Sequence, residues 1–239
     1  METNNRRKFI KISASTLFFG SLLGGGVYLA PQLNAQKNLL RPPGALDEKD
    51  FLSTCIKCGQ CVQVCPYHTL SLLDINSGNS VGTPYVDARS RGCYLCDLLP
   101  CVLACPSGSL NHDITQANQV EMGVAFLKNP TSCLALLNTP VTQEDIAEIL
   151  THSNKNEREA KVLENLQSYV GKPCTICADL CPYPQKEKAI AMVQSKNGQW
   201  YPEVRNECVG CGVCEELCPT KNEAAIVIIP RKKYSEVHQ

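Results

Sequence analysis

The apolar residues of this chain fall into short runs separated by polar turn sequences, a pattern typical of β-hairpins. The clearest pair of runs is 189–193 and 200–204, with Asn-Gly at 197–198 between them. Asn-Gly between two apolar runs is a strong short-range signal for a tight hairpin turn. Residues 71–75 and 85–86 repeat the pattern more weakly around an Asn-Ser-Gly turn. We therefore expect two short antiparallel hairpins.

Residues 134–173 carry a helical pattern instead. Thr142 and Asp145 have the spacing of a capping box, and apolar residues follow at helical intervals. Residues 157–170 predict a second helix, which Gly171 ends. The simpler interpretation is a passive helical insertion on the surface. The alternative is a docking element for a redox partner, since amphipathic helices often serve that purpose.

The N-terminus shows a third pattern, a charged start followed by an uncharged apolar stretch. Arg6 and Arg7 precede residues 12–30, which contain no charged residue and several glycines. This order predicts a twin-arginine signal peptide over residues 1–35, with cleavage after Ala35. The alternative is an uncleaved membrane anchor, because 19 uncharged residues could just span a bilayer.

Cysteine dominates the chemistry that the sequence offers. The chain has 16 cysteines, which fall into four motifs that each end on Cys-Pro. Three motifs are complete runs of four cysteines, and the third motif is one short until the upstream Cys133 is counted. In chain order the motifs are Cys55, Cys58, Cys61 and Cys65; Cys93, Cys96, Cys101 and Cys105; Cys133, Cys174, Cys177 and Cys181; and Cys208, Cys211, Cys214 and Cys218.

The spacing of these cysteines predicts iron–sulfur clusters. A [4Fe–4S] cubane is held by four thiolates, and C-x-x-C-x-x-C-x-x-x-C-P is a bacterial ferredoxin run. A disulfide framework does not require this repeated spacing, and cysteines so close together are poor partners for one another. Zinc sites favour paired Cys-x-x-Cys units or histidines at ligand spacing, and covalent haem needs Cys-x-x-Cys-His; neither pattern is present. We expect four [4Fe–4S] clusters with all 16 cysteines as ligands.

The motifs recur at an even interval. The step from the last cysteine of one motif to the first of the next is 28, 28 and 27 residues along the chain. This regularity supports Cys133 as the first ligand of the third motif. Each Cys-Pro is expected to open a short helix, because proline suits the first helical position. Strand, cluster loop, short helix and hairpin, repeated, predict an α+β fold. We expect residues 36–230 to form two ferredoxin-like units related by a pseudo-twofold axis. The insertion at 134–173 lies within this region, and residues 231–239 form a C-terminal tail.

Length and charge limit the class of protein. Of the 239 residues about 204 follow the signal, enough for one or two domains. That part carries 19 basic and 22 acidic side chains, a net charge of −3, and no motif for nucleic-acid binding.

Clusters are assembled where thiols stay reduced, so a protein that receives them before export must travel folded. The twin-arginine route carries folded cargo, and we expect a periplasmic protein at the membrane surface.

Several short sequences near the cysteines are distinctive. They are residues 41–45 (RPPGA), 82–85 (GTPY), 105–109 (CPSGS) and 122–125 (MGVA). With these sequences and the four cysteine motifs, the chain resembles the NapG/MauM family of ferredoxin-type proteins. The departure is the insertion at 134–173, which is only a few residues long in that family.

The resemblance implies a periplasmic electron-transfer protein whose 16 cysteines all bind clusters. It would take electrons from a membrane quinol-oxidising partner, NapH-like, and pass them toward periplasmic nitrate reductase. MauM-like members accompany methylamine oxidation instead, and another molybdenum reductase is a further acceptor to consider. The sequence shows no catalytic motif, so we expect no catalytic site of its own. A subunit of a quinol dehydrogenase complex and a cluster-bearing assembly factor stay open as alternatives.

Which cysteines share a cluster is a separate question. In two-cluster ferredoxins the fourth cysteine of each run binds the other run's cluster. Four motifs can then pair as neighbours or nested, and the near-equal intervals do not decide. The second motif, with Pro100 before Cys101, resembles that of four-cluster reductase subunits, whose pairing is nested. On that resemblance we expect the clusters of motifs one to four to be completed, in order, by Cys218, Cys181, Cys105 and Cys65.

Overall fold

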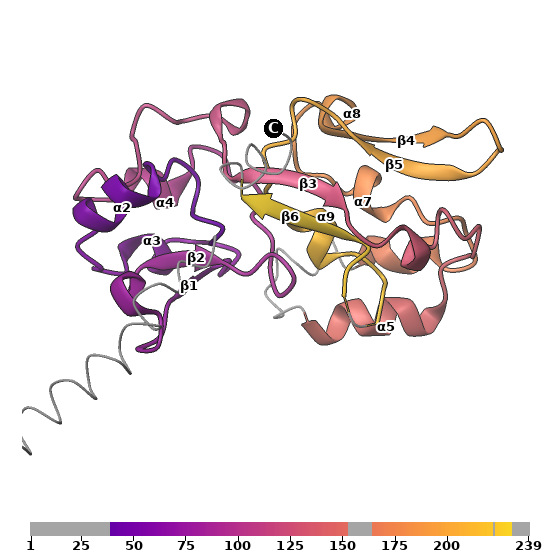
Figure 1. Ribbon diagram of the computed structural model, residues 1–239, viewed down its shortest axis with the longest axis horizontal. Coiled ribbons are helices and arrows are strands. Elements are labelled where there is room, and N and C mark those ends of the chain that lie inside the picture. The colour runs from indigo at the N-terminus through magenta and orange to yellow at the C-terminus, as the bar shows by residue number, and fades with distance from the viewer. Residues whose placement is uncertain (1–38, 153–163, 222, 231–239) are drawn as a thin grey trace, which may run out of the picture.

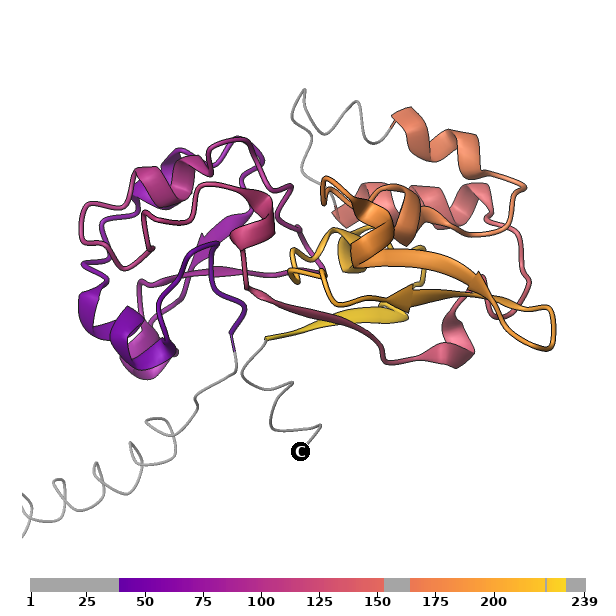
Figure 2. The same cartoon turned by 90° about the horizontal axis from the view of Figure 1, so that it is seen from above.

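The computed structural model describes residues 39–152, 164–221 and 223–230. The predicted signal peptide and C-terminal tail lie outside the described residues. The described chain forms two halves that lie side by side (Figures 1 and 2). The first half contains the first two cysteine motifs, and the second half contains the other two. Within this described part, no helix is both long and apolar enough to cross a membrane.

Both halves are built from short helices and from strands of three to five residues. In the first half the elements, with η for a 3₁₀-helix, are α2 (Glu48–Thr54), α3 (Gln60–Gln63), β1 (Leu70–Leu72), η1 (Gly78–Ser80), β2 (Pro84–Val86), α4 (Pro100–Leu103) and η2 (Ala117–Gln119). In the second half they are β3 (Gly123–Leu127), η3 (Pro130–Ser132), α5 (Gln143–His152), η4 (Gln167–Tyr169), α7 (Ile176–Asp179), α8 (Lys186–Ala189), β4 (Ile190–Gln194), β5 (Trp200–Val204), α9 (Val213–Glu216) and β6 (Ile226–Pro230).

The strands pair two by two, all antiparallel. β1 pairs with β2, and β4 pairs with β5, which confirms both predicted hairpins. Gly198, in the turn between β4 and β5, has a φ of +81°, a conformation that favours glycine. β3 pairs with β6, so that Gly123 faces Pro230 and Leu127 faces Ile226. Sequence periodicity did not predict this third pairing, because the two strands are far apart in the chain.

One connection recurs in both halves. In the first half Ala45, which precedes the first motif, bridges Leu110, which follows the second motif. In the second half β3 precedes the third motif and pairs with β6, which follows the fourth. Each half therefore closes on itself, with a hairpin between its two motifs. The mixture of short helices and strands agrees with the expected α+β class.

Four one-turn helices carry cysteines. Each of α3, α4, α7 and α9 contains the third cysteine of its motif and ends before the Cys-Pro. The prediction that each Cys-Pro opens a helix is therefore wrong. The α-helical region is disfavoured for a residue that precedes proline, so the Cys-Pro ends the helix. Proline does take the first helical position in α4, where Pro100 stands directly before Cys101.

The insertion contains the first helix that its sequence predicts. The Asp145 N–H donates to Thr142 Oγ1 at 3.2 Å, and the Thr142 N–H donates to Asp145 Oδ2 at 2.8 Å, which completes the capping box. α5 then buries Ile146 and Ile149. The first part of the second predicted helix lies outside the described residues, and its end appears as η4. The apolar face of α5 is thus used for packing within the chain.

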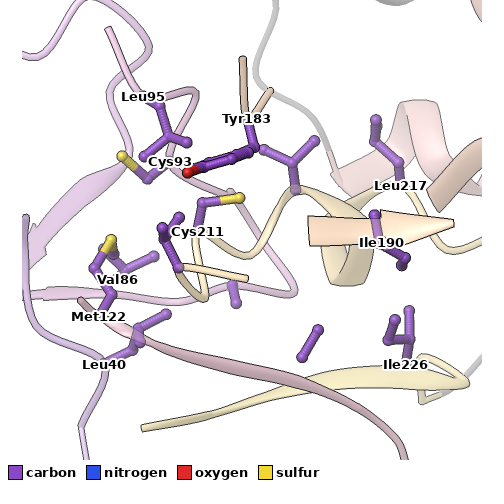
Figure 3. Close-up of a cluster of buried hydrophobic side chains, with 14 of the residues drawn as sticks. Leu40, Val86, Cys93, Leu95, Met122, Tyr183, Ile190, Cys211, Leu217 and Ile226 are labelled. Atoms are coloured by element: carbon purple, nitrogen blue, oxygen red, sulfur yellow. The ribbon is translucent and has the colours of Figure 1, made fainter. Parts of the chain in front are cut away.

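A continuous cluster of buried side chains joins the two halves. Figure 3 shows part of it, with Leu40 and Val86 from the first half and Ile190 and Ile226 from the second. Aromatic residues make up only 6% of the chain. The cluster is therefore made mainly of aliphatic side chains and cysteines, among them Cys93 and Cys211.

Arg41 ties the start of the described chain to α2 and to the first hairpin. Its guanidinium donates to Glu48 Oε1 and Oε2 at 2.6 and 2.9 Å. It also donates to Thr83 Oγ1 at 2.9 Å and to the Pro84 carbonyl at 2.8 Å. The same group lies over the Phe51 ring, 4.8 Å from the ring centroid. Because Arg41 is only 7% exposed, its loss would leave buried acceptors without a donor.

Replacing Arg41 by methionine should lower the free energy of unfolding by about 2 kcal/mol, because it leaves the buried Thr83 hydroxyl and Pro84 carbonyl without their donor and breaks the partly buried pair with Glu48. As a control, Lys221→Met should change it by less than about 0.5 kcal/mol, since its pair with Glu144 spans 3.7 Å between exposed side chains. Anaerobic urea denaturation of the three proteins measures the difference. An Arg41→Met protein as stable as the control would contradict this account.

Candidate metal centres

All 16 cysteines lie in the described residues, and none of them forms a disulfide. They gather at four places, which we call centres A and B in the first half and centres C and D in the second. Each place brings together three cysteines of one motif and one cysteine of another. The disulfide alternative therefore receives no support from the structure.

Centre B surrounds a small cavity of about 20 Å³. It is lined by Cys93, Cys96 and Cys101 of the second motif and by Cys65 of the first motif. Helices α3 and α4 contact each other, which brings the end of the first motif to the second. The side chains of Leu70 and Leu99 line the same cavity and make its wall apolar.

Centre A is formed by Cys55, Cys58 and Cys61 of the first motif with Cys105 of the second. Burial, together with the nearby thiols of Cys55, Cys105 and Cys58, raises the pKa of Cys61 to about 11. This electrostatic contact places Cys105 beside the first motif. Cys58 is the one exposed cysteine of the 16, so centre A is open to solvent.

Centres C and D repeat the arrangement in the second half, around small cavities of about 20 Å³ each. Centre C is lined by Cys181, Cys208, Cys211 and Cys214. Centre D is lined by Cys133, Cys174, Cys177 and Cys218. The structure therefore places Cys133 with the two cysteines of the third motif that the even interval assigned to it.

These sets overturn the nested pairing. Cys65 lies with the second motif and not with the fourth, and Cys218 lies with the third motif and not with the first. The motifs pair as neighbours, the first with the second and the third with the fourth. The physical reason is the closure of each half: the Ala45–Leu110 bridge and the β3–β6 pair each enclose two consecutive motifs.

The donor set fits a [4Fe–4S] cluster at each centre. A cubane takes four thiolates, and each centre offers four cysteine sulfurs. Three of the centres surround cavities of nearly equal size. Within residues 39–152, 164–221 and 223–230, no group of three or more histidine, cysteine, aspartate or glutamate side chains converges on one point as closely as a single ion requires.

Backbone N–H groups donate to several of the sulfurs. The Thr69 N–H donates to Cys65 Sγ at 3.3 Å, and the Ala225 N–H donates to Cys218 Sγ at 3.3 Å. A third bond of this kind, 3.4 Å long, runs from β3 to Cys208 Sγ. Such bonds stabilise the negative charge of a bound thiolate and tune the reduction potential of a cluster.

Burial raises the pKa of most of the enclosed thiols. The pKa of Cys101 and that of Cys174 rise to about 12, mainly because the side chains are buried. For the same reason the pKa values of Cys93, Cys177 and Cys214 lie well above the ordinary range. Only the thiolate is a ligand, so metal binding has to compensate for the free energy needed to deprotonate these buried thiols. Folding is therefore coupled to metal binding.

Cys105 is an exception. Burial acts to raise its pKa, but hydrogen bonds from the Ser109 side chain and from the backbone of Leu110 and Ser107 lower it to about 7. Ser109 Oγ lies 3.2 Å from Cys105 Sγ. The CPSGS sequence at 105–109 therefore supplies polar groups that favour a thiolate at centre A.

Two glycines inside the motifs meet different needs. Gly59 has a φ of +73° before α3, and a Cβ at this position would meet nothing within 4 Å, so the turn itself requires glycine. Gly210 has a φ of +69°, and its Cβ would lie 2.2 Å from the backbone of Gly123. The loop of centre C thus packs directly on β3.

Sequence reasoning missed two charged residues that connect the halves. Glu216, in α9, is 1% exposed and accepts the Gly92 N–H at 2.8 Å. Arg89 donates to three backbone carbonyls at or just after α9, at 2.6 to 3.0 Å. Neither residue carries a sequence signal, because their partners are 124 to 131 residues away in the chain.

Comparisons with known proteins agree with this geometry. Residues 54–109 match the family described as a 4Fe-4S dicluster domain. That range contains all the cysteines of centres A and B and ends four residues after Cys105. No solved structure is significantly similar to the chain.

The chain is similar along most of its length to several ferredoxin-type proteins. It is 35% identical to the methylamine utilization ferredoxin-type protein MauM of Methylorubrum extorquens, over 86% of this chain and 79% of that protein. It is 33% identical to the ferredoxin-type protein NapG of Escherichia coli, over 95% of this chain and 86% of that protein. NapG of Haemophilus influenzae is 35% identical, over 94% of this chain and 71% of that protein.

The pairing can be tested with double variants. Cys61→Ala with Cys105→Ala should release no more iron than Cys105→Ala alone, about 4 atoms per chain, because both cysteines serve one cubane. Cys61→Ala with Cys65→Ala should release about 8, because these two serve different cubanes. Iron analysis after anaerobic purification provides the measurement. The nested pairing requires two sites to be damaged in the first double variant.

Proposed function

The chain belongs to the NapG and MauM family of ferredoxin-type proteins, and we propose that it is an exported electron-transfer protein with four [4Fe–4S] clusters, one in each of centres A to D. The observation that carries this proposal is the convergence of the 16 cysteines into four sets of four. In the proposal all 16 are cluster ligands, and residues 36–230 form the cluster-binding region after a signal at 1–35.

The bound clusters supply one-electron transfer. The residues of the chain hold them in place and line centres B, C and D with mainly apolar side chains. N–H donors such as those of Thr69 and Ala225 stabilise the thiolates. We propose no catalytic site of the chain's own, so that substrates are oxidised or reduced by its partners.

We also infer that the two halves are ferredoxin-like units related by a pseudo-twofold axis. The order of elements supports this inference. In each half an outer segment is followed by a motif, a hairpin, a second motif and the segment that pairs with the first one. The insertion at 134–173 is then an addition to the second unit only.

For the route of the electrons, we propose a membrane quinol-oxidising partner of the NapH type as donor and a periplasmic reductase as acceptor, nitrate reductase foremost. The similarity to NapG proteins and to the ferredoxin-type protein NapF of Escherichia coli supports this choice. The protein would act in the periplasm at the membrane surface, after export in the folded state. A second candidate, a role in methylamine oxidation, is supported by the 35% identity to a methylamine utilization ferredoxin-type protein, MauM.

A cluster-deficient variant tests the function in cells. If the protein conducts electrons, Cys105→Ala should abolish quinol-dependent nitrate reduction in the periplasm while the reductase still accepts electrons from an artificial dye. An assembly factor would instead lower both activities, because the reductase itself would be incomplete. Loss of methylamine-dependent respiration with nitrate reduction intact would support the second candidate.

Iron content tests the number of clusters. The purified protein should hold about 16 iron atoms per chain, and Cys133→Ser should lower this number by removing one ligand of centre D. Ser132→Ala, at the neighbouring residue, is the matched control and should keep all the iron. A Cys133→Ser protein with the iron content and the electron paramagnetic resonance spectrum of the original would show that Cys133 is not a ligand.

The export route can be tested at the arginine pair. Arg6→Lys together with Arg7→Lys should leave the protein in the cytoplasm with its clusters intact, because the pair is read as an address and has no part in cluster binding. Lys8→Arg with Lys11→Arg preserves the pair and should be exported normally. Cell fractionation followed by absorption spectroscopy compares the two proteins, and periplasmic arrival of the first would refute the assignment.

A further inference from the structure

Centres B and C meet at the boundary between the two halves. The N–H of Cys93, in centre B, donates to the carbonyl of Cys211, in centre C, at 2.6 Å. Figure 3 shows these two cysteines next to each other, with their sulfur atoms turned in opposite directions. A single backbone hydrogen bond therefore joins residues that belong to two different centres.

The remaining centres are adjacent within each half. Helix α3, which carries Cys61 of centre A, contacts α4, which carries Cys101 of centre B. In the same way α7, which carries Cys177 of centre D, contacts α9, which carries Cys214 of centre C. The four centres therefore follow one another as A, B, C and D. In terms of the motifs that give three cysteines each, this is the order first, second, fourth and third.

Two glycines allow the close approach of centres B and C. A Cβ on Gly92 would lie 2.4 Å from Val213 N and 2.7 Å from the carbonyl carbon of Gly212. Gly212 has a φ of +92°, and its own Cβ would lie 2.8 Å from Ala88 Cβ. No side chain fits on either glycine, so the backbones of the two halves touch directly beside Cys93 and Cys211.

Side chains from both halves lock this contact. Arg89 reaches from the first half to the carbonyls of Glu215, Cys218 and Thr220 at 3.0, 2.9 and 2.6 Å. In return, Glu216 of the second half accepts the Gly92 N–H at 2.8 Å. These bonds are buried or partly buried, which limits competition from water. The separation of centres B and C is thus fixed by the fold.

We propose that electrons cross between the two halves at the Cys93–Cys211 contact, and that Gly92, Gly212 and Arg89 are positioning residues for this step. The proposal rests on the proposed function, since it requires clusters in all four centres. In the step one electron leaves centre B and enters centre C, or the reverse, and no bond is made or broken. Electronic coupling falls steeply with distance, and the Cys93–Cys211 hydrogen bond directly connects cysteines of two different centres.

The contact can be tested on the full, cluster-loaded chain by electron paramagnetic resonance of the fully reduced protein at two microwave frequencies. The original protein should show four spins coupled in a row. Gly92→Ala should keep all the iron but show weaker coupling between centres B and C, because the added methyl group pushes the two backbones apart. The control is Gly198→Ala, in the turn between β4 and β5, whose Cβ would meet only the Gln194 side chain, at 3.8 Å. It should retain the coupling between the halves.

The outcomes separate this proposal from the proposed function. An iron-replete Gly92→Ala protein with the unaltered spectrum overturns the crossing point, whereas fewer than four clusters in the original protein count against the proposed function instead. If Gly92→Ala accumulates without iron, Arg89→Ala takes its place. That variant removes three hydrogen bonds across the boundary without adding a methyl group, and it should weaken the coupling between the halves. An unchanged spectrum there would also overturn the proposal.

Discussion

The rest of this structure depends on one constraint: four cysteine sulfurs must converge at each of four points in the fold. Burial raises the pKa of thiols such as Cys101 and Cys174 to about 12, so the protein alone disfavours the thiolates that a cluster needs. Isolated one-turn helices and two-stranded hairpins are also marginal in water. Metal binding resolves both problems together, because it stabilises the thiolates and holds the short elements that carry them.

The way each half closes determines which sulfurs can meet. A chain segment before the first motif of a half pairs with a segment after its second motif, as Ala45 does with Leu110. Between the motifs a hairpin reverses the chain. The fourth cysteine of one motif then reaches the three of its neighbour, as Cys65 reaches Cys93, Cys96 and Cys101. A nested arrangement would require the motifs of different halves to interleave, which these closures prevent.

The sequence predicted features that local rules govern and failed where distant contacts decide. Asn197-Gly198 marked a hairpin, and Thr142 with Asp145 marked a helix start, because turns and caps depend on neighbouring residues. The even interval assigned Cys133 to the third motif, where the structure places it. The pairing of motifs depends on β3 with β6, which no local pattern reveals. The helices after Cys-Pro were predicted wrongly, because the restriction on the residue before proline outweighed proline's own preference.

The insertion changes the electrostatics at one end of the row of centres. Its helix α5 begins at the capping box of Asp145, and this carboxylate adds slightly to the rise in the pKa of Cys174, in centre D, that burial mainly causes. A negative charge beside a centre opposes the further negative charge that reduction adds. At the opposite end, centre A has the exposed Cys58 and the Cys105 thiol, which hydrogen bonds stabilise in its charged form. The two ends of the row therefore differ in solvent access and in local charge. This difference arises mainly from residues outside the cysteine motifs. Clusters bound by four motifs of similar sequence can therefore differ in reduction potential.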